Sequence, residues 1–133
     1  MKKLLKIVTI LSILLLTVFA GGCGKSQDEK YMEARNEFVA LQQKFDKENA
    51  ERQKKMDKMP LVEFCESYIK IVGGFQKEAD KKLENMAEIA KGKLELVKDV
   101  EQVKREHHKK YDQYFNLLGD MEKELKKAKQ KQK

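Results

Sequence analysis

The chain has 133 residues, of which 38% are charged and 8% aromatic, with one proline and no tryptophan. This length allows one domain, and the composition favours long helices over a β-sandwich or barrel. Three lysines in the first 22 residues and six in the last eleven supply more than the whole net charge of +7, which leaves about −1 between them. A basic face for nucleic acid is therefore not expected on the folded part.

The N-terminal residues have the organisation of a secretory signal. Basic residues occupy three of the first six positions, and an apolar stretch runs from Ile7 to Ala20. This stretch is shorter than the roughly 20 residues that a membrane span needs. Small residues follow, and then Cys23. This order is typical of a cleaved signal peptide, and an uncleaved membrane anchor is the alternative.

The segment Ala20-Gly21-Gly22-Cys23 resembles the lipobox of bacterial lipoproteins, although that family most often has Leu where this chain has Ala20. The resemblance covers residues 1–23. It implies that residues 1–22 are removed and that Cys23 becomes the acylated, palmitate-bearing N-terminus of an exported protein. Such a protein is anchored on the outer face of the cell membrane of a monoderm, or in the outer membrane of a diderm. An acylated Cys23 leaves Cys65 alone, and we expect Cys65 to be buried.

A first helix is predicted after a short linker that ends at residue 27. Ser26 and Glu29 have the spacing of a capping box. Polar residues continue the pattern as far as Lys58, so the second half of this helix is expected to bury little. Pro60 should end this helix or begin the next one. The apolar positions follow a heptad spacing: Tyr31, Ala34, Phe38, Leu41 and Phe45.

A second apolar stripe has the helical period of about 3.6 residues. It crosses Gly73-Gly74, where the helix is expected to kink or break. Ile69–Val72 also resembles a short strand, but the chain offers no partner strand. The stripe consists of Leu61, Cys65, Tyr68, Val72, Phe75, Ala79, Leu83, Met86 and Ala90.

A third stripe follows the predicted turn Lys91-Gly92-Lys93. Three helices joined by short turns predict an all-α, elongated antiparallel bundle over residues 28–125. The alternative is a coiled-coil hairpin in which residues 61–130 form one helix that pairs with the first helix or with a second molecule. The third stripe consists of Leu94, Val97, Val100, Lys104, His107, Tyr111, Tyr114, Leu118, Met121, Leu125 and Ala128.

No motif in the sequence predicts catalysis. The chain has no glycine-rich phosphate loop and no His-Glu-x-x-His segment. His108 and Asp112 share a helix face, but they are an incomplete ligand set for zinc. His107 lies on the apolar stripe, where a partly buried imidazole is expected. We therefore expect no catalytic, metal or cofactor site, and we assign the aromatic side chains to the core.

Residues 126–133 form a basic, low-complexity tail, which is expected to be either a solvated end or a contact for anionic polymers or lipid headgroups. A loose similarity to the small murein-linked outer-membrane lipoprotein also implies covalent attachment of Lys133 to peptidoglycan. The lysines expected to contact an anionic polymer or headgroups are Lys126, Lys127, Lys129, Lys131 and Lys133.

These observations favour a non-catalytic lipoprotein. We expect it to be held to the membrane by the lipid on Cys23 and to act as an interaction or scaffold protein of the cell envelope through its helix surfaces. The alternative is a binding module for anionic envelope polymers or headgroups through the lysine-rich tail. Self-association through the heptad positions is compatible with either function.

Overall fold

The computed structural model describes residues 24–131, all of whose secondary structure is helical. The predictions for residues 1–22, Cys23 and Lys133 lie outside this range. The predicted all-α class is confirmed, with no strand between residues 24 and 131. The elements are α2 (Gln27–Lys55), a 3₁₀ turn (Met56–Lys58), α3 (Leu61–Tyr68), a π-helical turn (Ile69–Gly73), α4 (Gly74–Ala90), α5 (Leu94–Phe115) and α6 (Leu118–Lys131).

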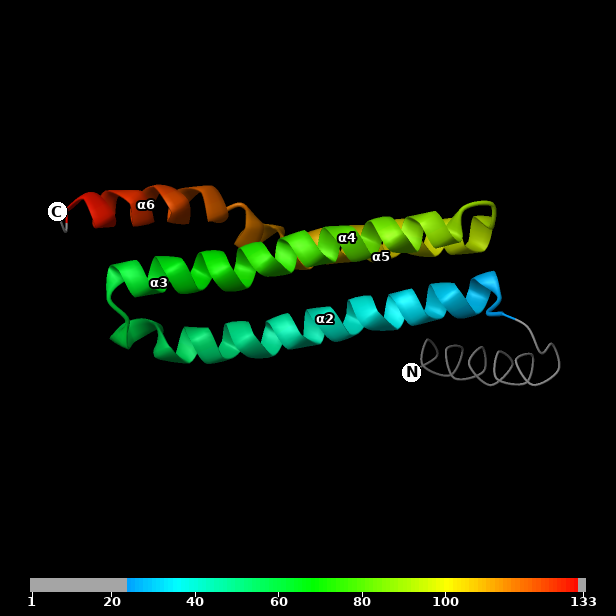
Figure 1. Cartoon of the computed structure of the whole chain (residues 1–133), viewed down its shortest axis with the longest axis horizontal. Helices are drawn as coiled ribbons and strands as arrows, with labels where there is room; N and C mark the ends of the chain where they lie inside the picture. Colours follow the sequence, from blue (N-terminus) through cyan, green and yellow to red (C-terminus); the bar gives the residue numbers. More distant parts are fainter. Residues whose placement is uncertain (1–23, 132–133) are drawn as a thin grey trace.

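These elements form an elongated up-down-up bundle. The helix α2 runs along one side, and α3 and α4 return beside it as one rod (Figure 1). The helix α5 then packs along α4, and α6 packs along α3. The chain reverses at Gly92, whose φ of 84° is easily adopted only by glycine. The alternative of one helix over residues 61–130 is therefore wrong. None of the described helices has the length and hydropathy required to cross a bilayer.

The first helix begins as predicted, because the Ser26 hydroxyl accepts a hydrogen bond from the Glu29 amide. Its predicted apolar positions are buried, with Leu41 only partly so. The expectation that its second half buries little is wrong, since Asn49 and Arg52 are both 5% exposed. The reason is α3, which places the Tyr68 ring 4.9 Å from the Arg52 guanidinium carbon, in a cation–π contact.

The second stripe is confirmed from Cys65 to Ala90, but Leu61 is 55% exposed at the start of α3. The helix continues through Gly73-Gly74 as the π-helical turn instead of breaking. A Cβ at Gly73 would lie 3.8 Å from a Leu118 methyl carbon, so this glycine faces the start of α6.

The third predicted helix is in fact two helices, because the chain turns at Asn116-Leu117. The turn lets α6 leave the line of α5 and pack along α3 and the π-helical turn. The buried face of α5 also differs from the prediction. Val103 and Phe115 are buried in place of Lys104, whereas Leu94 and Val97 are 68% and 38% exposed.

Polar side chains fix α5 beside α2, which runs parallel to it. The Tyr31 hydroxyl and the Arg35 Nε both donate to the Asp99 carboxylate. About three helical turns further on, Lys110 Nζ and the Tyr111 hydroxyl donate to Asp46, each over 2.9 Å. Because the residue numbers of the bonded partners differ by a nearly constant amount, these contacts specify the register of α2 and α5.

Candidate interaction surfaces at the two ends of the bundle

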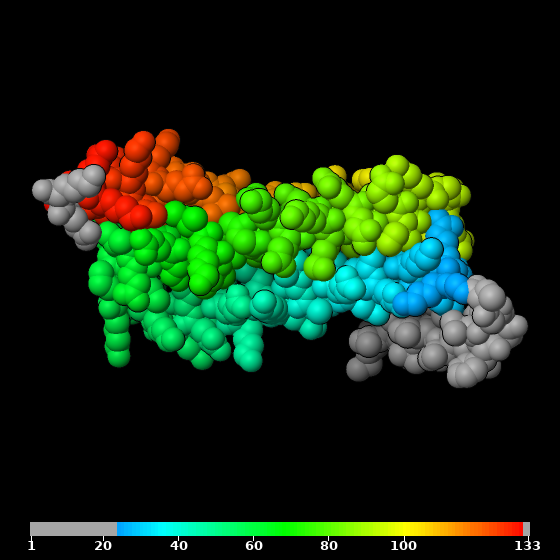
Figure 2. Space-filling view, viewed as in Figure 1, coloured from blue at the N-terminus to red at the C-terminus, as the bar shows by residue number. Residues whose placement is uncertain are grey.

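The two ends of the bundle are built from different segments. The N-terminal end consists of residues 24–28, at the start of α2, and the turn of residues 91–93. The distal end consists of the 3₁₀ turn, the start of α3 and the second half of α6. Figure 2 shows the start of α2 against the α4–α5 turn at one end, and α6 against α3 at the other. At 1.5 Å per residue, the 29 residues of α2 separate the ends by about 43 Å.

Side-chain hydrogen bonds and an ion pair connect the segments of the N-terminal end. The Gln27 side-chain amide donates to the carbonyl oxygens of Ile89, over 2.8 Å, and Lys91, over 2.9 Å. The Lys93 ammonium donates to both carboxylate oxygens of Asp28. The start of α2 and the α4–α5 turn therefore form one structural unit. Cys23, the predicted lipidation site, lies outside the described residues and is bonded directly to Gly24, the first of them.

The distal end contains a shallow pocket of about 230 Å³ between the start of α3 and α6. Apolar side chains from both helices line it, and three charged side chains surround them. We call this the distal pocket. Its residues are Pro60, Leu61, Val62, Glu124, Lys127, Ala128 and Lys131.

The structure places four of the five predicted lysines on α6, where all four are exposed. Their expected boundary at residue 126 is not a structural one, since α6 continues to Lys131. Lys127 pairs with Glu124, and Lys129 pairs with Glu66 of α3, each at 3.5 Å. Such exposed pairs are weak, so an external anion can compete for these lysines. The fifth lysine, Lys133, lies outside the described range. Within that range, two of the lysines form no ion pair: Lys126 and Lys131.

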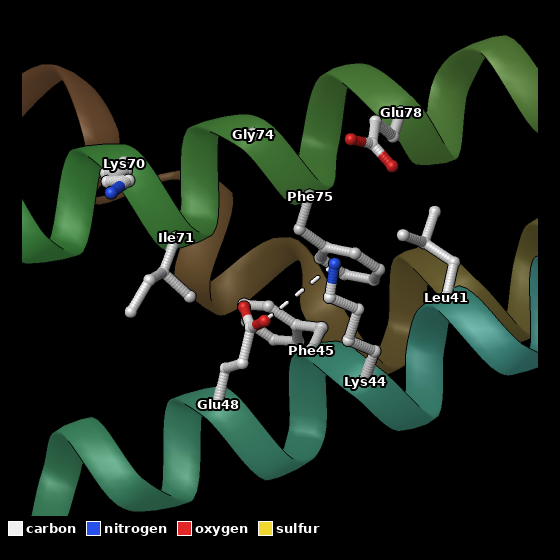
Figure 3. Close-up of a pocket in the computed structure, with 9 residues that line it drawn as sticks. All are labelled: Leu41, Lys44, Phe45, Glu48, Lys70, Ile71, Gly74, Phe75 and Glu78. Carbon is white, nitrogen blue, oxygen red and sulfur yellow. Dashed lines mark ion pairs between the residues drawn. The ribbon is translucent and has the colours of Figure 1, made fainter.

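A second pocket, of about 290 Å³, lies midway along the bundle between α2 and the π-helical turn. Its floor is the stacked pair Phe45 and Phe75, whose ring centroids lie 4.1 Å apart (Figure 3). Lys44 and Glu48 form an ion pair at 3.9 Å beside these rings. The rings belong to the bundle core, and the pocket is an apolar depression with a charged border.

The two histidines have different environments. His107 is 1% exposed among aromatic rings, and its Nδ1 lies 3.1 Å from the Gln42 amide nitrogen. Burial, with a smaller contribution from His108, lowers the pKa of His107 to about 4. His108 is half-exposed and pairs with Asp112 at 2.9 Å. In residues 24–131 no third metal-ligating side chain joins a pair of this kind.

Cys65 is fully buried, as expected, and burial raises the pKa of its thiol. It therefore acts as a small apolar side chain of the core.

The composition of the tail predicts the exposed lysines of the distal end but not the pocket beside them. The sequence pattern predicts Pro60 as a helix boundary and Leu61 as a core position, and it indicates no role for Glu66. The distal pocket joins two segments that are far apart in the chain, so its signal is tertiary. The exposure of Leu61, at the end of its stripe, is the one feature that a sequence can suggest, because stripe ends often project beyond the packed core.

Comparisons with known proteins provide no relative for this chain. No family model matches it, and neither a curated protein nor a solved structure shows significant similarity.

Proposed function

We propose that this chain is a non-catalytic lipoprotein of the bacterial envelope that carries an interaction surface on a rigid helical rod. In this proposal the lipid on Cys23 holds the N-terminal end of the bundle at the membrane, and the distal end contacts another envelope protein. The observation that carries the proposal is the separation of the two ends. Cys23 precedes the described residues at one end, whereas the distal pocket lies about 43 Å away, by the length of α2.

The chemistry of the distal pocket supports a protein partner. Leu61 and Met56 are 55% and 44% exposed at this end, and apolar side chains at the centre of a patch contribute most of the binding energy in interfaces. Lys127 and Lys131 border the pocket and favour a partner with carboxylates at matching positions.

Mass spectrometry of the mature protein tests the anchor. We expect an N-terminus at Cys23 with acyl chains attached, and a longer, unacylated precursor in Cys23→Ser. A mature N-terminus elsewhere, or an unmodified Cys23 in the wild type, would contradict the proposal.

Pull-down from detergent extracts tests the distal surface. Leu61→Glu should remove the bound partner, because it introduces a charge into the apolar lining of the distal pocket. Leu117→Glu is the matched control, since Leu117 is 44% exposed but lies at the α5–α6 joint. If both variants lose the partner equally, or if neither variant loses it, the distal pocket is not the binding surface.

A second function, binding of anionic envelope polymers or lipid headgroups, is favoured by the exposed lysines of α6. Within residues 24–131, Lys126 and Lys131 form no ion pair, and they lie on the same helix as Lys127 and Lys129. Each lysine near an anionic surface contributes about 1 kcal/mol, and salt screens this attraction.

Salt dependence separates the two functions. Retention on an anionic polymer should fall steeply between 0.1 and 1 M salt, since the Debye length shrinks from about 10 to 3 Å. Replacement of the five tail lysines by glutamine should abolish this dependence. Five glutamines in place of exposed lysines of the other helices serve as the matched control. A tail variant that keeps salt-sensitive retention would exclude this second function.

A further inference from the structure

We infer that the α4–α5 turn, with the exposed side chain of Leu94, is a second membrane contact beside the lipid on Cys23. In this arrangement the bilayer that holds the lipid also holds the turn, and the two contacts keep the bundle upright. The inference rests on the proposed function, because it requires an anchored Cys23.

The reach of the chain places the turn at the membrane surface. Only Gly24, Lys25 and Ser26 separate Cys23 from α2, and three residues span at most about 11 Å. The first turn of α2 is therefore held close to the headgroups. Gln27 donates to the Lys91 carbonyl oxygen, so the α4–α5 turn stands at the same level.

The chemistry of the turn suits the polar boundary of a bilayer. Leu94 is 68% exposed, the most exposed of the large apolar side chains of the described residues, and Val97 follows one turn later. Burial in the folded protein does not explain these positions, whereas insertion of one Leu at the headgroup level is favourable.

The charges nearest Leu94 are of both signs. The Lys93 ammonium is paired with Asp28, and Lys91 is paired with Glu88 at 2.7 Å. The flanking lysines therefore approach the headgroups as neutral pairs. Glu95, the residue after Leu94, is exposed and forms no ion pair within residues 24–131, so Leu94 enters the boundary with Glu95 kept on the aqueous side.

Tryptophan fluorescence of the mature, lipidated protein in vesicles tests the inference, because the wild-type chain has no tryptophan. The vesicles contain phosphatidylcholine and phosphatidylglycerol with bromine on the upper acyl chain. We expect Leu94→Trp to lose about half of its emission and to shift to the blue, as for a side chain buried in the headgroup boundary. Met56→Trp, exposed at the distal end, is the matched control and should be unaffected.

Flotation of the vesicles distinguishes the possible failures. If the wild type does not float with the vesicles, the anchor is absent, and both the proposed function and this inference fail. If the protein floats but Leu94→Trp is not quenched, only the inference fails. Equal quenching of Leu94→Trp and Met56→Trp means that the bundle lies flat, which also overturns the inference.

Discussion

Among the described residues, His107 shows how the core of this bundle tolerates a polar side chain. Its ring contacts Phe38, Phe75, Tyr111 and Phe115, with ring centroids between 5.0 and 5.8 Å. One nitrogen is satisfied by Gln42, and the other, Nε2, has no partner. A neutral imidazole fits this site, whereas a protonated ring would place a charge among aromatic side chains.

The burial of His107 predicts that the bundle loses stability in mild acid. The folded-state pKa of about 4 lies below the ordinary 6.5, so the unfolded chain binds the proton more readily. The buried, neutral His107 therefore contributes fully to the free energy of unfolding above pH 6.5. This contribution, roughly 3 kcal/mol in total, is lost as the pH falls toward 4. Urea unfolding of residues 24–133 across this pH range measures the loss.

Two variants separate this effect from the titration of the carboxylates. His107→Leu should flatten the pH dependence between pH 6.5 and 4, since leucine has no proton to bind. His108→Gln, at the neighbouring half-exposed position, should keep it. A flat profile in the wild type, or the same slope in His107→Leu, would refute the assignment.

At the scale of elements, the hydrophobic periodicity of the sequence predicts which positions of a helix are buried against its neighbours. The heptads of α2 and the stripe from Cys65 to Ala90 are correct because each buried position contacts a neighbouring helix. The break at Asn116-Leu117 contains no glycine or proline, and the nearby Gly119 lies inside α6. The cause of the break is tertiary: the turn lets Leu118 and the rest of α6 pack along α3 and the π-helical turn.

Alanine substitution of two glycines at element junctions should change the free energy of unfolding in opposite directions. Gly74 has helical dihedrals, and a Cβ there would meet no atom within 4 Å. Gly74→Ala should therefore stabilise the protein by about 0.5–1 kcal/mol. Gly92 has a φ of 84°, so Gly92→Ala should destabilise it by about 1–2 kcal/mol. Urea unfolding measures both, and changes of the same sign would contradict the assigned conformations.

At the scale of the whole molecule, the interaction surfaces depend on which segments the fold brings together. The composition of the tail predicts exposed lysines, and four of them are exposed on α6. The distal pocket and the level of Leu94 follow only from the packing of α6 on α3 and of Gln27 on the α4–α5 turn. Contacts between distant segments of this kind leave no periodic signal in a single sequence.

The end of α6 should contribute little to the stability of the bundle. Removal of residues 126–133 deletes exposed lysines, two weak ion pairs with Glu66 and Glu124, and the half-buried Ala128, but it keeps Leu118 and Met121 against the bundle. Changes at such positions usually stay within about 0.5 kcal/mol, so the Tm should fall by less than about 4 °C. Removal of residues 118–133 should be much more damaging, because it uncovers the face of α3 that includes Cys65. Thermal unfolding followed by circular dichroism compares the two truncations, and equal losses would mean that the tail itself holds α6 on the bundle.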